Sequence, residues 1–300
     1  MSSSSQPFLT IWRLSDGKPG HDKQSLGLCH ALARLTPARC IDIRVHGGWK
    51  ALVHWLAGRF PEGRHLPRPQ LLVGAGHATH LPLLAARRAR GGKAVVVMRP
   101  SLPLGLFDLC LIPEHDRPPR RGNVIATRGA LNDVVPGTAR DATRGLILVG
   151  GPSPHFRWDG DAVLRQARAL AAARPELHWT LSTSRRTPEG FLAGLVDSGI
   201  ACVDAAATPP GWLEAQLAGA GEAWITPDSV SMVYEALTAG CRVGLFDLTA
   251  VPGSRVAAGI AALSAHGYVA PTPDVRPAPP PQPLAEAERC ARLILERDLA

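Results

Sequence analysis

The pattern of apolar and polar positions divides the chain into short apolar runs of strand length, separated by segments with helical spacing. The predicted strands are 8–14, 41–45, 71–75, 93–98, 109–112, 124–127, 146–149, 178–181, 200–203, 223–226 and 242–246. The predicted helices cover 24–32, 49–60, a basic segment ending at Arg90, 161–173, 191–196, 212–217, 231–239, 256–264 and 284–297. Because strand and helix alternate with short connections, we expect an α/β protein with parallel sheets.

The length of 300 residues favours two domains over one. Residues 137–144 are polar and unpatterned, as in an interdomain link, and the alternation restarts after them. We therefore predict an N-terminal domain over 1–140 and a C-terminal domain over 141–282. Residues 271–283 are rich in proline and predict a stiff linker. The remaining helix, within 283–300, is expected to pack back on the first domain.

The residues that follow the strand at 223–226 are typical of an anion site. Asp228, Ser229 and Ser231 surround a predicted helix start, where free N–H groups and the helix dipole favour phosphate. Glu235 shares a helix face with Ser231, and a carboxylate there can accept both hydroxyls of a ribose. The alternative is that Asp228 or Ser229 caps the helix and Glu235 compensates its dipole. We favour a nucleotide.

Two further strands of the second half also end in polar or glycine-rich loops. The candidate ligand-binding residues in them are Gly150, Gly151, Ser153, Ser182, Ser184 and Arg185, with Arg186 beside them. Backbone N–H groups, hydroxyls and a guanidinium at one edge of a parallel sheet could together hold a diphosphate. The alternative is that glycine and serine simply make turns. Neither a Walker A motif nor GxGxxG is present in the sequence.

The first strand runs into a loop from Asp16 to His21 that is distinctive for its two glycines. A histidine suits general-base chemistry near neutral pH, so Asp16 and His21 are the candidate catalytic residues. The alternative, equally weighted, is a histidine near a helix start with Asp22 as the N-cap. His77 and His80 frame another strand end, but no third ligand lies at a recognisable spacing, so zinc is not expected.

The predicted helix 49–60 places bulky apolar residues on one face and basic residues elsewhere. This composition is typical of a helix on a membrane surface. More often such a helix packs on its own sheet, and its crossover position favours core packing here.

Composition narrows the classes of partner and compartment. The net charge is +8, carried by 33 basic residues of which only four are lysines, and it favours anionic partners such as nucleotides or lipid surfaces. Nucleic acid is not expected, because aromatic residues do not interleave the basic ones. Six scattered cysteines without CxxC indicate a reducing compartment. Without a leader-like N-terminus or a membrane-spanning run, we expect a cytoplasmic protein, peripheral at most on the inner face of a membrane.

Seven stretches resemble one known family, the mitochondrial-fission ELM family, which is found in plants and many bacteria. They are DGKPGHDKQSLGL, GHATHLPLL, MRPSLPLGLFDLCLIPEHD, GALN, LVGGPSPHFRWD, STSRRTP and WITPDSVSMVYEALTAGCRVGLFDL, which lie within residues 11–248. The family is similar, more distantly, to GT-B glycosyltransferases. That resemblance implies two Rossmann-like domains facing a cleft, with the nucleotide sugar in the C-terminal one.

The peptidoglycan N-acetylglucosaminyltransferase is the nearest GT-B pattern, and the resemblance to it implies roles for particular residues. His21 matches the candidate base, Gly150 to Ser153 resembles the phosphate loop, and Ser229 or Ser231 with Glu235 resembles the ribose side. Two departures are visible. Lys18 and Pro19 replace small residues in the first loop, and no acceptor-binding motif is identifiable.

These observations together predict a metal-independent, inverting glycosyltransferase that uses a nucleotide-sugar donor as its substrate and needs no cofactor. It would act in envelope glycan or glycolipid synthesis, on a glycan or lipid-linked acceptor at the membrane surface. Two alternatives stay open. One is a nucleotide-sugar epimerase on the same fold, and the other is a non-catalytic scaffold that recruits a membrane-remodelling partner.

Overall fold

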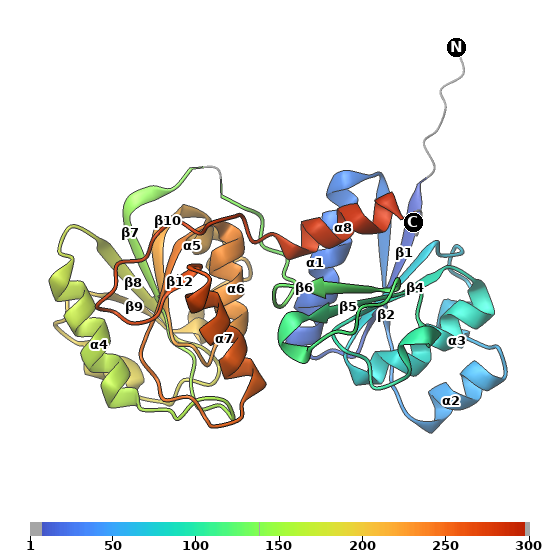
Figure 1. Ribbon diagram of the computed structural model, residues 1–300, viewed down its shortest axis with the longest axis horizontal. Helices are drawn as coiled ribbons and strands as arrows, with labels where there is room; N and C mark the ends of the chain where they lie inside the picture. The colour runs from blue at the N-terminus through green and yellow to red at the C-terminus, as the bar shows by residue number, and fades with distance from the viewer. Residues whose placement is uncertain (1–7, 138, 298–300) are drawn as a thin grey trace, which may run out of the picture. The chain divides into compact units, whose positions relative to one another are not determined.

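The computed structural model describes residues 8–137 and 139–297, and the chain in it forms two compact units (Figure 1). Unit 1 comprises Met1–Asp133 with Ala285–Ala300, and unit 2 comprises Val134–Leu284. The predicted domain boundaries fall in the irregular segments that join these units. Residues 1–7, on which the expectation about a leader rests, lie outside the described residues.

Unit 1 contains one six-stranded parallel sheet in the order β2-β1-β3-β4-β5-β6. The strands are β1 (Leu9–Ser15), β2 (Ala38–Arg44), β3 (Leu71–Ala75), β4 (Lys93–Val97), β5 (Leu109–Pro113) and β6 (Val124–Thr127). The helices are α1 (Pro19–Leu35), α2 (Trp49–Leu56), α3 (His80–Arg90) and α8 (Glu286–Glu296). Short 3₁₀ turns cover Pro61–Gly63, His77–Thr79, Leu104–Leu106 and Glu114–Asp116.

Unit 2 contains a second six-stranded parallel sheet, in the order β12-β11-β10-β7-β8-β9. The strands are β7 (Asp141–Leu148), β8 (His178–Ser182), β9 (Ala201–Val203), β10 (Ala220–Ile225), β11 (Arg242–Leu245) and β12 (Val269–Ala270). The helices are α4 (Gly160–Ala173), α5 (Trp212–Gly219), α6 (Val230–Ala239) and α7 (Arg255–Ala265). The segments Phe191–Leu195 and Ala205–Ala207 are 3₁₀ turns, so the α-helix predicted at 191–196 is wrong in type. The α/β class with parallel sheets is confirmed.

The strand order reverses next to the first strand of each sheet. In unit 1 the chain steps from β1 to β2 and then crosses to β3 on the other side of β1. In unit 2 it steps from β7 through β8 to β9 and then crosses to β10 on the other side of β7. Connections leave such a point on opposite faces, and open α/β sheets bind ligands in the crevice that results. The loops after β1, β3, β7 and β10 are therefore the first places to look for a site.

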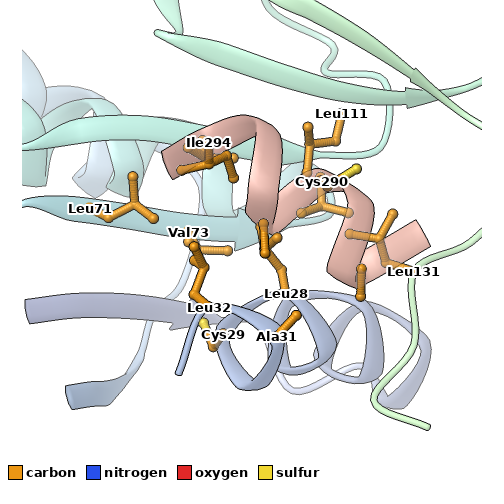
Figure 2. Packing of buried hydrophobic residues seen from close by; sticks show 14 of the residues in the cluster. Leu28, Cys29, Ala31, Leu32, Leu71, Val73, Leu111, Leu131, Cys290 and Ile294 are labelled. Atoms are coloured by element: carbon orange, nitrogen blue, oxygen red, sulfur yellow. The ribbon is translucent and has the colours of Figure 1, made fainter. Parts of the chain in front are cut away.

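The core of unit 1 shows why its strands are nearly continuous apolar runs. Both faces of the sheet are covered, which is the rule for parallel sheets. One face packs under α1 and α8, and Figure 2 shows Cys290 and Ile294 of α8 lying over Leu28 and Leu32 of α1. Glu286, 6% exposed at the start of α8, accepts the backbone N–H of Arg128 at 2.9 Å. The C-terminal helix thus completes the core of unit 1.

The helix at Trp49–Leu56 corrects the prediction of core packing. Trp49, Leu52, Val53 and Leu56 are all exposed, and only Ala51 is fully buried. The physical reason is that α2 packs beside α3 rather than on the sheet, and it does so through Ala51 and the partly buried Trp55. Among the described residues, no helix is both long enough and apolar enough to cross a bilayer.

Because α8 completes the core of unit 1, a cavity made in its buried face should lower the stability of the protein. Ile294 is 0% exposed, so Ile294→Ala should lower the free energy of unfolding by roughly 2–4 kcal/mol. Urea denaturation followed by circular dichroism measures the change, with the exposed Arg292→Ala on the same helix as the control. Equal midpoints for the two variants would contradict a structural role for α8.

Candidate functional site

The first half-site lies in unit 1, at the point where the strand order reverses. The Nδ1 atom of His21, in the first turn of α1, lies 2.9 Å from Oδ2 of Asp16, which follows β1. Gly76, which follows β3, leaves room for the imidazole ring, because a side chain there would collide with it. The His21 Nε2 atom makes no hydrogen bond to the described residues. A histidine held by a carboxylate through Nδ1, with Nε2 free, is arranged as a general base.

The Asp16 carboxylate is ionised, which suits this role. Burial opposes ionisation, but hydrogen bonds from His21 and from the Lys18 N–H outweigh it and lower the pKa of Asp16. The charge on Asp16 therefore favours the histidine tautomer that carries its proton on Nδ1.

The alternative reading of Asp22 as the helix N-cap is wrong. Lys18 occupies the N-cap position, and α1 begins at Pro19. Asp22 instead pairs with Arg13 at 3.3 Å, and Arg13 also makes a two-point contact with Asp42 on β2. Arg13 is 7% exposed, so this network ties α1 to the sheet below the His21 loop.

His80 and His77 stand beside His21 at the end of β3. His80 is 3% exposed, and its pKa is lowered to about 4 because burial disfavours the imidazolium and because His77 and His21 lie close. Its Nδ1 atom lies 3.2 Å from Oγ of Ser101, in the loop after β4. The described residues contain no group of three or more side chains placed to hold a metal ion.

The second half-site lies in unit 2, between the loops after β7 and β10. The N–H of Gly150 donates to Oγ1 of Thr226 at 2.7 Å, and the N–H of Gly151 donates to Oδ2 of Asp228 at 2.9 Å. A side chain at Gly150 would collide with Asp228, and one at Gly151 with the Arg186 carbonyl. Thr226 and Asp228 thus accept the two glycine N–H groups in this structure, so these N–H groups are not open to a ligand.

Arg186 fastens a third loop, after β8, to the other two. Its guanidinium pairs with Oδ2 of Asp228 at 2.8 Å and donates to the carbonyls of Gly151 and Pro152 at 3.0 Å each. In the same loop, Oγ of Ser184 donates to the carbonyl of Gly150 at 2.9 Å. The three loops that the sequence predicted to meet are brought together, with most of their polar atoms satisfied by each other.

The hydroxyls of Ser153 and Ser182 also form hydrogen bonds within their own loops. Oγ of Ser153 accepts the N–H groups of His155 and Phe156 at 3.2 and 3.3 Å, which shapes the turn after β7. Ser182 is 4% exposed, and its hydroxyl donates to the neighbouring Thr183 carbonyl.

Further candidate residues for a ligand lie around the start of α6. Ser229 is the N-cap residue, but its side chain makes no capping hydrogen bond, and the first turn contains no acidic residue. Ser231 is exposed, and Glu235 lies one turn further along with 2% exposure. Arg185 is exposed and forms no ion pair with the described residues. An uncapped helix start is suited to an anion, and so is a guanidinium that has no ion pair.

Several residues of the two half-sites carried no recognisable signal in the sequence. Thr226 and Thr187 lie in the loops of unit 2 and hydrogen-bond the backbone of 149–150. Arg44 ends β2, and its guanidinium lies against Gly17 of the first loop. The parallel pairing of β1 with β2 explains why the end of β2 meets this loop, so a correct strand order would have found Arg44.

The buried His80 predicts a loss of stability in mild acid. An unfolded histidine has a pKa near 6.5, so between pH 6.5 and about 4 the unfolded state binds a proton that the native state does not. The free energy of unfolding should therefore fall as pH falls through this window, by up to about 3 kcal/mol. Urea denaturation across this pH range should show a shallower fall for His80→Gln. The exposed His178→Gln should behave as the unmodified protein, and parallel curves for all three would contradict the assignment.

Known proteins match the chain in sequence and in fold. The sequence model described as mitochondrial fission ELM1 matches residues 19–297. No curated protein matches the sequence. A candidate UDP-N-acetylglucosamine 2-epimerase of Listeria monocytogenes is 10% identical with a TM-score of 0.57, covering 98% of this chain and 90% of its own.

Two further solved structures have similar folds. The MnaA protein of S. aureus, solved with UDP, is 11% identical with a TM-score of 0.53, covering 96% of this chain and 89% of its own. MurG of Acinetobacter baumannii is 12% identical with a TM-score of 0.50, covering 98% of this chain and 92% of its own. At these identities the likeness establishes the fold, so the predicted pair of Rossmann-like domains of the GT-B type is confirmed.

Proposed function

The chain belongs to the mitochondrial fission ELM1 family, and from that membership and its two half-sites we propose that it is a nucleotide-sugar-dependent glycosyltransferase. The observation that carries the proposal is the meeting of three loops at the strand reversal of unit 2, beside an uncapped helix start. In this proposal the donor diphosphate lies at the start of α6, next to Arg185 and Ser231. Glu235, one turn further along α6, accepts the ribose hydroxyls.

The chemistry of unit 1 completes the proposed reaction. His21 takes the proton of the acceptor hydroxyl through Nε2, while Asp16 stabilises the imidazolium that forms. The hydroxyl oxygen forms a bond to the anomeric carbon of the sugar as the bond from that carbon to the diphosphate breaks. Arg185 and the α6 N–H groups meet the charge on the departing diphosphate. Direct displacement of this kind inverts the anomeric centre and requires no metal ion.

An epimerase is the second candidate, favoured by the three histidines at the ends of β1 and β3. His21, His77 and His80 give unit 1 more than one group able to move protons, and epimerisation needs an acid and a base but no acceptor. One protein with a similar fold is described as a candidate UDP-N-acetylglucosamine 2-epimerase. Consumption or rearrangement of the donor without any acceptor separates this candidate from a transferase.

Nucleotide binding should depend on Arg185 and Glu235. Calorimetry with UDP, UDP-N-acetylglucosamine and GDP-, CMP- and ADP-sugars identifies the ligand. For that ligand, Arg185→Ala and Glu235→Gln should each weaken binding by about tenfold or more, the effect of losing one charged hydrogen bond. Arg165→Ala, an exposed arginine on α4, is the matched control for charge and should leave the affinity unchanged. The proposal fails if no nucleotide or nucleotide sugar binds.

The role of His21 predicts a separation of chemistry from binding. His21→Gln removes the base and should reduce turnover of the donor by roughly 10²- to 10⁴-fold. Its nucleotide affinity should stay within experimental error of that of the unmodified protein, because the donor is bound by unit 2. His30→Gln, an exposed position on the same helix, is the control. If His21→Gln turns over donor at the full rate, His21 is not the base.

A further inference from the structure

The helix α2 (Trp49–Leu56) carries an apolar face that points to solvent. Trp49 is 71% exposed, Leu52 40%, Val53 48% and Leu56 62%. Their spacing of three, four and seven residues puts them on one side of the helix. Nine large apolar residues are exposed in the described chain, and four of them lie on this single helix of eight residues. Such a concentration marks an interaction surface.

The opposite face of α2 packs against the rest of unit 1, and this packing fixes which side of the helix is exposed. Ala51 is 5% exposed, and Trp55 packs against the apolar core that includes Trp12 and Phe60. Figure 1 shows α2 beside α3 at the periphery of unit 1, and contacts between the two helices hold it there. A helix that is apolar on both faces requires a second apolar partner.

The net charge of the chain segment that contains α2 indicates which kind of partner this face binds. The segment from Arg44 to Arg68 contains five basic residues, all exposed, and one acidic residue, Glu62, which gives a net charge of +4 with histidines neutral. Helix α2 itself contains no acidic residue. An exposed apolar helix face within a basic segment is the pattern of a helix that lies in the headgroup region of an anionic bilayer. A second copy of the same face would bring two such basic segments together, so self-association is disfavoured.

We propose that α2 docks unit 1 on an anionic lipid bilayer, with Trp49, Leu52, Val53 and Leu56 inserted among the headgroups and acyl chains. Lys50 and Arg59 then contact the lipid phosphates. This surface is independent of the proposed glycosyl transfer, because it includes neither His21 nor the loops of unit 2.

Vesicle binding by the full-length protein tests the proposal. The protein should co-sediment with vesicles that contain phosphatidylglycerol and phosphatidylcholine, and much less with phosphatidylcholine alone. Trp49→Ser with Leu56→Ser should weaken this binding by about tenfold or more, because the apolar anchor is lost. Lys50→Glu with Arg59→Glu should weaken it by a similar factor, because each basic residue near the surface strengthens binding about fivefold.

The controls separate insertion from charge and from misfolding. Val196→Ser with Val275→Ser removes two exposed apolar side chains of unit 2 and should leave vesicle binding unchanged. Trp49→Phe should remove the component of tryptophan emission that shifts to the blue on adding vesicles. All variants should melt at the temperature of the unmodified protein. Binding that survives both double substitutions overturns the proposal. So does a protein that ignores vesicles but forms dimers that the α2 substitutions abolish.

Discussion

The reversal of strand order beside the first strand of each sheet is the constraint on which both half-sites depend. It separates the connections after β1 and β3, and those after β7 and β10, onto opposite faces of their sheets. The connections therefore leave a crevice at these strand ends, and the loops on either side of it lie close to each other. His21 meets Gly76 in unit 1, and Gly151 meets Asp228 in unit 2, for this same reason.

Asp228 decides how an anion can be bound in unit 2. Its carboxylate accepts the Gly151 N–H and pairs with Arg186, two groups that are of the kind that bind phosphate. Displacing it would leave a buried charge without its partner, which costs about 3–5 kcal/mol. A phosphate therefore gains nothing by competing for Arg186. The favourable donors are those that Asp228 leaves uncommitted, namely the start of α6 and the guanidinium of Arg185.

The elements were predictable from the sequence because buried parallel strands are continuous apolar runs, and the third strand matches its predicted bounds at 71–75. The loops were predictable as neighbours because parallel strands end at one edge. The hydrogen bonds between these loops were not predictable. Gly150 and Thr226, for example, are 76 positions apart, and no local pattern encodes such a pair. Asp22 shows the same limit. Its position near a helix start is typical of an N-cap, but its carboxylate forms an ion pair with Arg13 on the sheet.

The helix α2 shows why periodicity alone gave the wrong face. Apolar residues occupy both sides of it, and only the position of α3 decides that Ala51 and Trp55 turn inward. Its place in the chain also matters for the first half-site. Arg44 lies against Gly17 in the loop that carries His21, and α2 begins five residues later, a span of at most about 17 Å. A bilayer that holds α2 would therefore hold that loop close to the lipid surface, where the lipid-linked acceptor of the proposed transfer would present its hydroxyl.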